Sequence, residues 1–296
     1  MIHQTKGRNI MKNCIDLHAH TTFSDGTFTP TELVQKAKDV GLSAIAITDH
    51  NCILGNEEAE AVGKKIGVEV IHGVELSASY DEIGLHILGF FVDSRNKELN
   101  EKLKTLRDAS IDRNRKIFDK LRSLGLDVSY EELLALSGTQ MHGKYHISQY
   151  LVSKGIVDSV KDAMELYLKK GKVAYVERSV KKLTSAEGIN LIHASGGIAV
   201  LAHPIHYKSL NIKALEKLVF TLREQGLDGI EVYHSDHSSF ATNAFLCLAK
   251  EYGLYVTGGS DFHYETIPHF SLGKGYGGLN IPYSVLELLY TKIGGA

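Results

Sequence analysis

The sequence predicts an α/β barrel that is interrupted by a helical insertion. With 296 residues, the chain exceeds the usual size of a single domain unless that domain is a barrel. From residue 14, short β-branched runs alternate with amphipathic helical stretches, which is typical of parallel strands joined by crossover helices. The alternation stops near residue 95 and resumes near residue 181. We therefore expect a barrel domain over 14–94 and 181–296, a helical insertion over 95–180 and an N-terminal extension over 1–13.

The first half of the predicted barrel begins with the strand CIDLHAH. The helix after it begins with Thr29, Pro30 and Glu32, which supply an N-cap, a proline at the first helical position and the acid of a capping box. It ends at Gly41, and the apolar run LSAIAITDH follows, as expected for a strand buried on both faces. A second helix over 56–66 leads to the strands VEVIHGVELSASY and IGLHILGFFV, which a turn separates.

The second half of the chain starts with the insertion. Residues 97–124 form one charged helical stretch, residues 129–170 hold shorter helices, and KVAYVE is expected to be a strand. The alternation then resumes with helices over 185–194, 213–225 and 238–252, and with the strands GIAVLAHP, DGIEVYH and LYVTGGSDFH. The barrel would contain six or seven strands.

Composition limits the class of protein. Apolar residues at 43% and charged residues at 23% exclude a disordered chain, and a net charge of −2 disfavours long polynucleotides as the main partner. The three cysteines are scattered, so they form no disulfide framework and fit a reducing compartment. The N-terminus lacks an apolar signal region, and no window reaches the roughly 18 apolar residues of a membrane span. We expect a cytoplasmic protein.

Imidazoles and carboxylates gather where the predicted strands end. A single polar residue there is usually a helix cap or a solvated loop residue. In a barrel, however, the carboxyl ends of the strands meet at one rim, and burying many such groups together is costly without a cation. Imidazole and carboxylate without thiolate suit Mn, Zn or Fe, and so many ligands require two to three divalent metal ions. The residues concerned are His18, His20, Asp49, His50, Glu75, His86, His203, His234, Asp261 and His263.

The motifs that carry these residues are DLHAHTTFSDGTFTP, AITDHN, GVELS, HILGF, LAHP and SDFH. Together they resemble the PHP (polymerase and histidinol phosphatase) superfamily over residues 15–93 and 185–265. Within it, the chain is most similar to stand-alone bacterial phosphoesterases that act on nucleoside 3′,5′-bisphosphates and nucleoside monophosphates. The resemblance implies a distorted seven-stranded barrel with a helical insertion over its rim.

The resemblance also implies a trinuclear metal site. One ion would be held by His18, His20, Glu75 and Asp261, a second by the bridging Glu75 with His86 and His203, and a third by Asp25, His50 and His263. Asp16 would orient a ligand or accept backbone hydrogen bonds. The family often carries Arg-Pro-His in the insertion, where this chain has Lys144, Tyr145 and His146. Phosphate capture would differ accordingly, because lysine lacks the bidentate fork of arginine.

The function that follows is hydrolysis of a phosphomonoester of a small nucleotide, with water activated by the metal ions as nucleophile. His206 or His234 would protonate the leaving oxygen. A second phosphate or a base would contact the insertion at Lys144, His146, Lys172, Tyr175 and Arg178. A solvated surface explains Lys172 and Arg178 equally well, and strand packing explains Tyr175 equally well.

Three other functions stay open. They are a 5′-to-3′ exonuclease acting on short oligonucleotides, a histidinol-phosphate phosphatase, and a metal-holding regulatory domain without turnover. The oligomeric state is not indicated by any feature of the sequence.

Overall fold

The computed structural model describes residues 13–137, 139, 143–207, 210–264 and 270–294. Nearly all of the N-terminal extension predicted over 1–13 lies outside these residues. Eight strands follow one another in the order β8-β7-β6-β4-β3-β2-β1-β9, and β5 pairs beside β3. Their bounds are β1 (Cys14–Asp16), β2 (Leu42–Ile47), β3 (Glu69–Tyr80), β4 (Ile83–Phe90), β5 (Leu183–Thr184), β6 (Ile198–Leu201), β7 (Gly229–His234), β8 (Tyr255–Gly259) and β9 (Ile281–Pro282).

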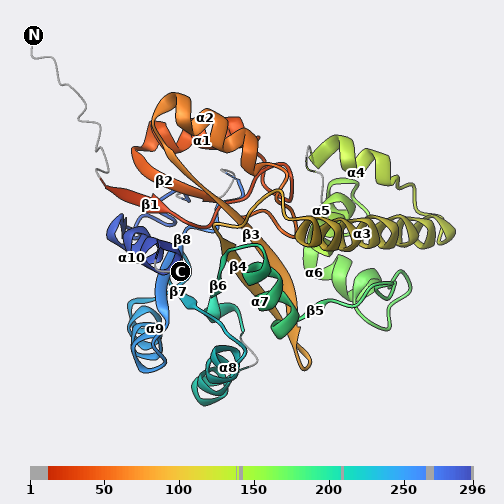
Figure 1. The fold of residues 1–296 in the computed structure, drawn as a ribbon. Helices are drawn as coiled ribbons and strands as arrows, with labels where there is room; N and C mark the ends of the chain where they lie inside the picture. The colour runs from red at the N-terminus through yellow and green to blue at the C-terminus, as the bar shows by residue number, and fades with distance from the viewer. Residues whose placement is uncertain (1–12, 138, 140–142, 208–209, 265–269, 295–296) are drawn as a thin grey trace, which may run out of the picture.

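The sheet closes on itself between β1 and β8. The backbone N–H of Leu17, just after β1, donates to the carbonyl of Gly258 in β8 at 3.1 Å. Ala19 and Phe262 form a further parallel bridge. The strands β1 to β4 and β6 to β8 thereby form a barrel, while β5 and β9 are two-residue additions (Figure 1). The predicted distorted seven-stranded barrel is confirmed.

The distortion is a hairpin of β3 and β4. These strands run antiparallel, and β4 is also antiparallel to β6, whereas β1, β2 and β3 are parallel to one another, as are β6, β7 and β8. Reversal of β4 brings its amino-terminal half to the rim where the parallel strands have their carboxyl ends. For this reason His86, early in β4, lies opposite Ser77 in β3 and reaches the rim.

Helices cover the outside of the barrel and one of its ends (Figure 1). The predicted capping box at Thr29 is present, since Thr29 accepts from the N–H of Glu32, and a second one is formed by Thr184, which accepts from the N–H of Glu187. Outward residues of the strands pack under α7, α8 and α9 in one apolar cluster and under α1 in another. Inward residues pack with α10. These helices are α1 (Pro30–Val40), α2 (Asn56–Ile66), α7 (Ser185–Ala194), α8 (Ile212–Glu224), α9 (Ser239–Glu251) and α10 (Ser284–Gly294), with the short 3₁₀ turn η2 (Pro204–His206).

The insertion has an apolar cluster of its own. Leu103, in the first half of α3, packs with the barrel, whereas Phe118 and Leu121 in its second half pack with the insertion. The prediction of a strand at KVAYVE is wrong, because residues 172–177 form turns and irregular chain. Ala174 is buried among helices, which offer no strand edge with which this segment could pair. The helices are α3 (Lys97–Ser123), α4 (Tyr130–Ser137), α5 (Lys144–Ser153), α6 (Val160–Ala163) and the π-helix η1 (Met164–Leu168).

The division at residues 95 and 180 stays a prediction. None of the helices within the described ranges combines the length and apolar character that a bilayer span requires.

Candidate metal centre

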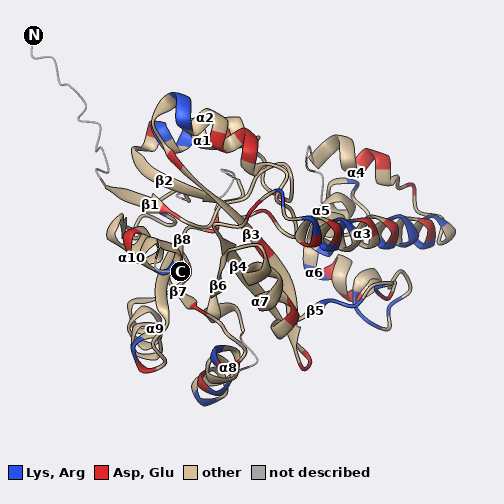
Figure 2. Cartoon of the chain, viewed as in Figure 1, with Lys and Arg blue, Asp and Glu red and all other residues tan. Residues whose placement is uncertain are grey.

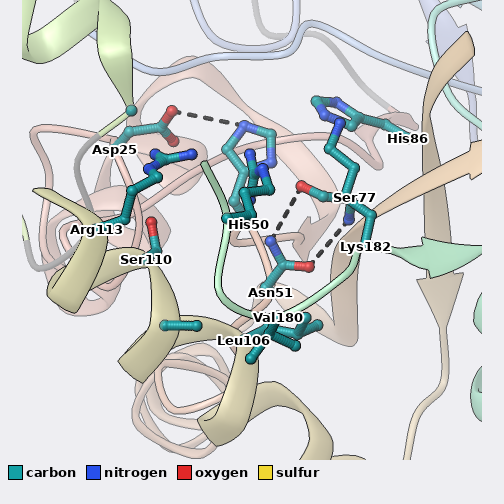
Figure 3. A pocket seen from close by; sticks show the side chains of 13 residues that line it. Asp25, His50, Asn51, Ser77, His86, Leu106, Ser110, Arg113, Val180 and Lys182 are labelled. Carbon is teal, nitrogen blue, oxygen red and sulfur yellow. Dashed lines mark hydrogen bonds and ion pairs between the residues drawn. The ribbon is translucent and has the colours of Figure 1, made fainter. Parts of the chain in front are cut away.

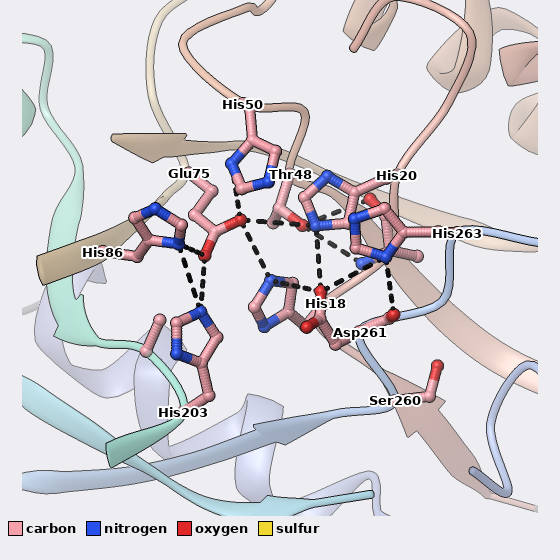
Figure 4. A network of polar contacts seen from close by, with 12 residues as sticks. His18, His20, Thr48, His50, Glu75, His86, His203, Ser260, Asp261 and His263 are labelled. Carbon is pink, nitrogen blue, oxygen red and sulfur yellow. Dashed lines mark hydrogen bonds and ion pairs between the residues drawn. The ribbon is translucent and has the colours of Figure 1, made fainter. Parts of the chain in front are cut away.

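The nine residues predicted as metal ligands lie together at the rim of the barrel. Figure 4 labels all of them except Asp25. Glu75, buried in β3, stands at their centre. Its Oε1 is 2.8 Å from Nδ1 of His86 and 2.9 Å from Nε2 of His203. Its Oε2 is 2.9 Å from Nδ1 of His50, 3.3 Å from Nε2 of His20 and 3.4 Å from Nε2 of His18. One carboxylate therefore contacts imidazoles that follow or belong to four different strands.

Two further carboxylates complete the cluster. Asp261, which follows β8, is 3.2 Å from His18 Nε2 and 3.1 Å from His20 Nε2 through its Oδ1. Asp25, in the loop after β1, lies 3.3 Å from His263 Nε2, 3.5 Å from His50 Nε2 and 3.6 Å from His20 Nδ1. His20 thus lies between Asp25 and Asp261, and the cluster forms one continuous network of acids and imidazoles.

Several buried atoms of the cluster lack a hydrogen-bond partner. They include His18 Nε2, Asp25 Oδ1, His50 Nδ1, Glu75 Oε2 and His203 Nδ1. His50 Nδ1 and Glu75 Oε2 face each other at 2.9 Å without the geometry of a hydrogen bond. Leaving such an atom unpaired costs about 1–3 kcal/mol. A shared cation would satisfy their lone pairs, so the donor set fits divalent metal ions.

Protonation balances the cluster when no cation is bound. Burial opposes charge on both His50 and His263. Glu75 and Asp25 nevertheless raise the pKa of His50 to about 10, and Asp25 and Asp261 raise that of His263 to about 9. Burial, together with the neighbouring His263, lowers the pKa of His20 to about 4. Metal binding at this centre would therefore displace protons, as it does wherever imidazoles and carboxylates are ligands.

Glu231 in β7 is a member of the centre that the sequence reasoning missed. The side chain is fully buried, and its Oε1 lies 3.0 Å from His18 Nδ1. Its Oε2 accepts from the backbone N–H of His203 at 2.7 Å. With both oxygens occupied, Glu231 positions two predicted ligands and leaves Nε2 of His18 free to face the centre. The sequence contained a signal for Glu231, because this acid lies in a buried strand on the face opposite the apolar Ile230 and Val232.

Two aspartates, Asp16 at the end of β1 and Asp49 just after β2, hold the loops of the rim in place. As predicted, Asp16 accepts backbone hydrogen bonds, from Ser260 at 2.8 Å, Gly273 at 2.8 Å and His18 at 3.2 Å. Asp49 accepts from the N–H of Thr21 at 2.7 Å and from its hydroxyl. Asp16 thereby ties the loops that carry His18 and Asp261 to each other.

Backbone strain is concentrated at the same rim. Asn51, His203 and Asp261 all have positive φ, of 48°, 26° and 58°, although none is a glycine. Such conformations cost about 1–3 kcal/mol and persist where the surroundings fix them. The N–H of Asp261 donates to the carbonyl of His18 at 2.9 Å, which holds the strained residue against the first strand.

The two predicted general acids occupy different surroundings. His206 is exposed, its Nε2 is 2.7 Å from Asp236 Oδ2, and its ring stacks on that of His203 with centroids 4.7 Å apart. His234 is buried, and its Nε2 faces Asp261 Oδ2 at 3.6 Å. His206 therefore lies at the solvent edge of the centre, where a leaving group would depart. Either role stays a prediction.

A pocket beside the centre is lined by residues of both the barrel and the insertion (Figure 3). Of the predicted substrate-binding residues, Arg178 lines it. Lys144 follows Gly143, which also lines the pocket, and its Nζ lies 4.6 Å from the ring centroid of Tyr175. His146 Nδ1 accepts from the N–H of Gly143 at 3.2 Å. Lys172 is exposed and does not belong to the described lining of the pocket. The lining includes Asp25, His50, His86, Arg113, Arg178 and Lys182, of which Arg113 and Lys182 were not predicted.

Comparison with known proteins identifies the family. The model of the PHP domain matches residues 16–178, so the chain belongs to the PHP family. A protein of Haemophilus influenzae named 5′-3′ exoribonuclease is 35% identical, with 84% of this chain and 89% of the relative covered. A 3′,5′-nucleoside bisphosphate phosphatase of Chromobacterium violaceum is 33% identical, with 84% and 87% covered.

A solved structure shares the fold. It is a candidate metal-dependent phosphoesterase from Bifidobacterium adolescentis, with a TM-score of 0.79 and 28% identity, over 94% of this chain and 96% of that one. The protein is thus a metal-dependent phosphoesterase of the PHP family, and a hydrolase.

Proposed function

We propose that the protein hydrolyses a phosphomonoester of a small nucleotide, either a nucleoside 3′,5′-bisphosphate or a nucleoside monophosphate. The observation that carries this proposal is the convergence of eight imidazole and carboxylate side chains around Glu75, next to a pocket with cationic residues. The relative from Chromobacterium violaceum supports the substrate class by its name. Two to three ions of Mn, Zn or Fe are the proposed cofactors, held by the nine residues.

The ions would lower the pKa of a water molecule and offset the negative charge of the phosphate group. The residues of the chain supply the rest. Glu231 and Asp16 fix the ligands, so that the centre needs little rearrangement when substrate binds. His206, held by Asp236 at the exposed edge, would donate a proton to the leaving oxygen.

The lining of the pocket agrees with an anionic substrate, because it joins residues of the metal centre to cationic side chains. The Haemophilus influenzae relative is named as an exoribonuclease. Exonuclease activity is therefore the second candidate, to be separated by experiment.

The test is turnover in the presence of Mn²⁺ with AMP, adenosine 3′,5′-bisphosphate, histidinol phosphate, a dinucleotide and an aryl phosphate. We expect phosphate release from one or both adenosine phosphates, and loss of at least about a thousandfold in kcat for His203→Ala. His193→Ala is the matched control, because His193 pairs with Asp228 at the start of β7, at the other end of the barrel. Cleavage of the dinucleotide with all monoesters left intact would replace the proposal by the exonuclease, and no turnover of any substrate would favour a regulatory domain.

A further inference from the structure

Two ligands of the second predicted ion, His86 and His203, lie where β4 and β6 separate. The two strands pair antiparallel up to Ile87 and Leu201, which places His86 opposite Ala202 as the next pair. In a hydrogen-bonded antiparallel pair, the two residues exchange both of their N–H···O bonds. Here one of the two bonds is direct, since the N–H of Ala202 donates to the carbonyl of His86 at 3.1 Å.

The hydroxyl of Tyr207 relays the other bond of this pair. It accepts from the N–H of His86 at 3.2 Å and donates to the carbonyl of Ala202 at 3.0 Å. The chain turns away from the sheet at His203, whose φ is 26°, and η2 then brings Tyr207 back to the gap. A side-chain hydroxyl thereby takes the place that the backbone of β6 leaves open.

The ring of Tyr207 is anchored, so that its hydroxyl has a fixed position. Only 8% of the residue is exposed, and the ring packs in the apolar cluster that includes Leu85 and Leu215. The N–H of Tyr207 donates to the carbonyl of Pro204 at 3.3 Å, which closes the turn. From residue 198 to residue 207 the chain has no Lys, Arg, Asp or Glu, and this stretch is tan in Figure 2. Apart from two histidines, the Tyr207 hydroxyl is therefore the polar side-chain group of this stretch.

His86 and His203 depend on the spacing of the two strands because they share one carboxylate oxygen. Nδ1 of His86 and Nε2 of His203 lie 3.2 Å apart, and Glu75 Oε1 contacts them at 2.8 Å and 2.9 Å (Figure 4). The predicted ligands of the other ions, besides Glu75, follow β1, β2 and β8 rather than β4 and β6. A shift between β4 and β6 would thus act mainly on the second ion.

We propose that Tyr207 is a positioning residue for the second ion, because its hydroxyl sets the spacing between the segments that carry His86 and His203. The inference rests on the metal centre of the proposed function and adds to it a residue that supplies no ligand. The proton and a lone pair of the hydroxyl are taken up by the backbone, so Tyr207 acts through the two histidines. Loss of such an outer partner typically lowers metal affinity by about 10–100-fold.

The test is a calorimetric titration of the chelator-treated protein with Mn²⁺, together with metal analysis of the loaded protein. Tyr207→Phe keeps the ring but removes the hydroxyl, so we expect one binding step to weaken by about tenfold and the others to change by less than about twofold. His86→Ala identifies the step of the second ion, since it removes a ligand and keeps the backbone N–H. Unchanged affinities in Tyr207→Phe, an equal loss in every step, or a loss in a different step overturns the inference.

The matched control is Tyr150→Phe in the insertion. Tyr150 is also buried, and its hydroxyl also accepts from a backbone N–H, that of Ser129 at 3.0 Å, and donates to an oxygen, Oε2 of Glu132 at 2.6 Å. Tyr150→Phe should therefore lower the urea midpoint, while every Mn²⁺ step stays within about twofold of the wild type. Weakening of Mn²⁺ binding to the degree seen in Tyr207→Phe would show that any lost hydroxyl has this effect, and would overturn the inference.

A double variant, His86→Ala with Tyr207→Phe, separates positioning from a general loss of order. With a ligand of the second ion already removed, the added Tyr207→Phe should leave the remaining Mn²⁺ steps within about twofold. A further loss in these steps overturns the inference.

Two provisions keep the outcome decisive. If chelator-treated Tyr207→Phe does not fold, the Mn²⁺-loaded protein is used, since bound ions stabilise the folded state. Release of Mn²⁺ to excess chelator is then timed, and one ion should leave about tenfold faster than from the wild type; release of all ions at wild-type rates overturns the inference. Absence of turnover with every phosphate substrate would refute the proposed function, while these Mn²⁺ measurements still judge the role of Tyr207.

Discussion

Replacement of Glu231 by glutamine is expected to weaken metal binding without unfolding the protein. Glu231 accepts one hydrogen bond from the imidazole of His18 and one from the backbone of His203. Glutamine keeps the shape but has only one acceptor oxygen, so its NH₂ group must face one of these two donors. The loss of one charge-assisted hydrogen bond is worth about 1.5–3 kcal/mol. Affinity for the cation should thus fall about 10–100-fold, equivalent to about 1.4–2.7 kcal/mol.

The assay is a titration of the chelator-treated protein with Mn²⁺, followed by calorimetry and by recovery of phosphatase activity. Glu251→Gln, an identical substitution at an exposed position of α9, serves as the control. Circular dichroism verifies that Glu231→Gln keeps its fold. If a folded Glu231→Gln protein binds Mn²⁺ within about threefold of the wild type, the positioning role assigned to Glu231 is refuted.

Three further predictions concern stability. Gly259→Ala should destabilise the fold by about 3 kcal/mol or more, because a Cβ there would lie 2.2 Å from Cβ of His18; Gly278→Ala, which meets nothing within 4 Å, should leave the urea midpoint unchanged. Burial lowers the pKa of His237 to about 4. The contribution of His237 to the free energy of unfolding is therefore complete above pH 6.5 and is lost as the pH falls toward 4. The stability of the wild type relative to His237→Gln should therefore decrease by up to about 3 kcal/mol in that window, and parallel urea midpoints for the two proteins at pH 7 and pH 4.5 would show this to be wrong. Saturating Mn²⁺ should raise the melting temperature of chelator-treated protein by several degrees, since it binds only the folded state; a calorimetric scan that shows no shift would contradict the assignment of the cluster as a metal centre.

The sequence was sufficient for the barrel because its local signals agree with one another. The capping boxes at Thr29 and Thr184 fix where helices begin, and the apolar runs fix the buried strands. KVAYVE was misread for a physical reason, since β-branched residues indicate a half-buried surface and here that surface is helical. The reversal of β4 could be suspected from the short turn before it, and it explains why His86 reaches the rim from the middle of a strand.

The sequence predicted the metal ligands of the candidate site, but only part of the lining of its pocket. Strand-end imidazoles and acids marked the predicted ligands, because the carboxyl ends of barrel strands meet at one rim. Arg113 gave no such signal: it lies in a helix rich in charged residues, where only the packing of α3 against the pocket decides which side chains are buried. Lys172 had the right charge in the right segment, yet the turn that carries it leaves it exposed.

The sequence by itself determined which chemical groups end the strands and therefore which kind of centre the barrel can hold. Tertiary structure alone decided how these groups share their contacts, with Glu75 between five imidazoles and Glu231 behind two of them. It also decided which cations of the insertion face the pocket. The reason is that strand alternation fixes the direction of a side chain locally, whereas burial and pairing depend on segments far apart in the chain.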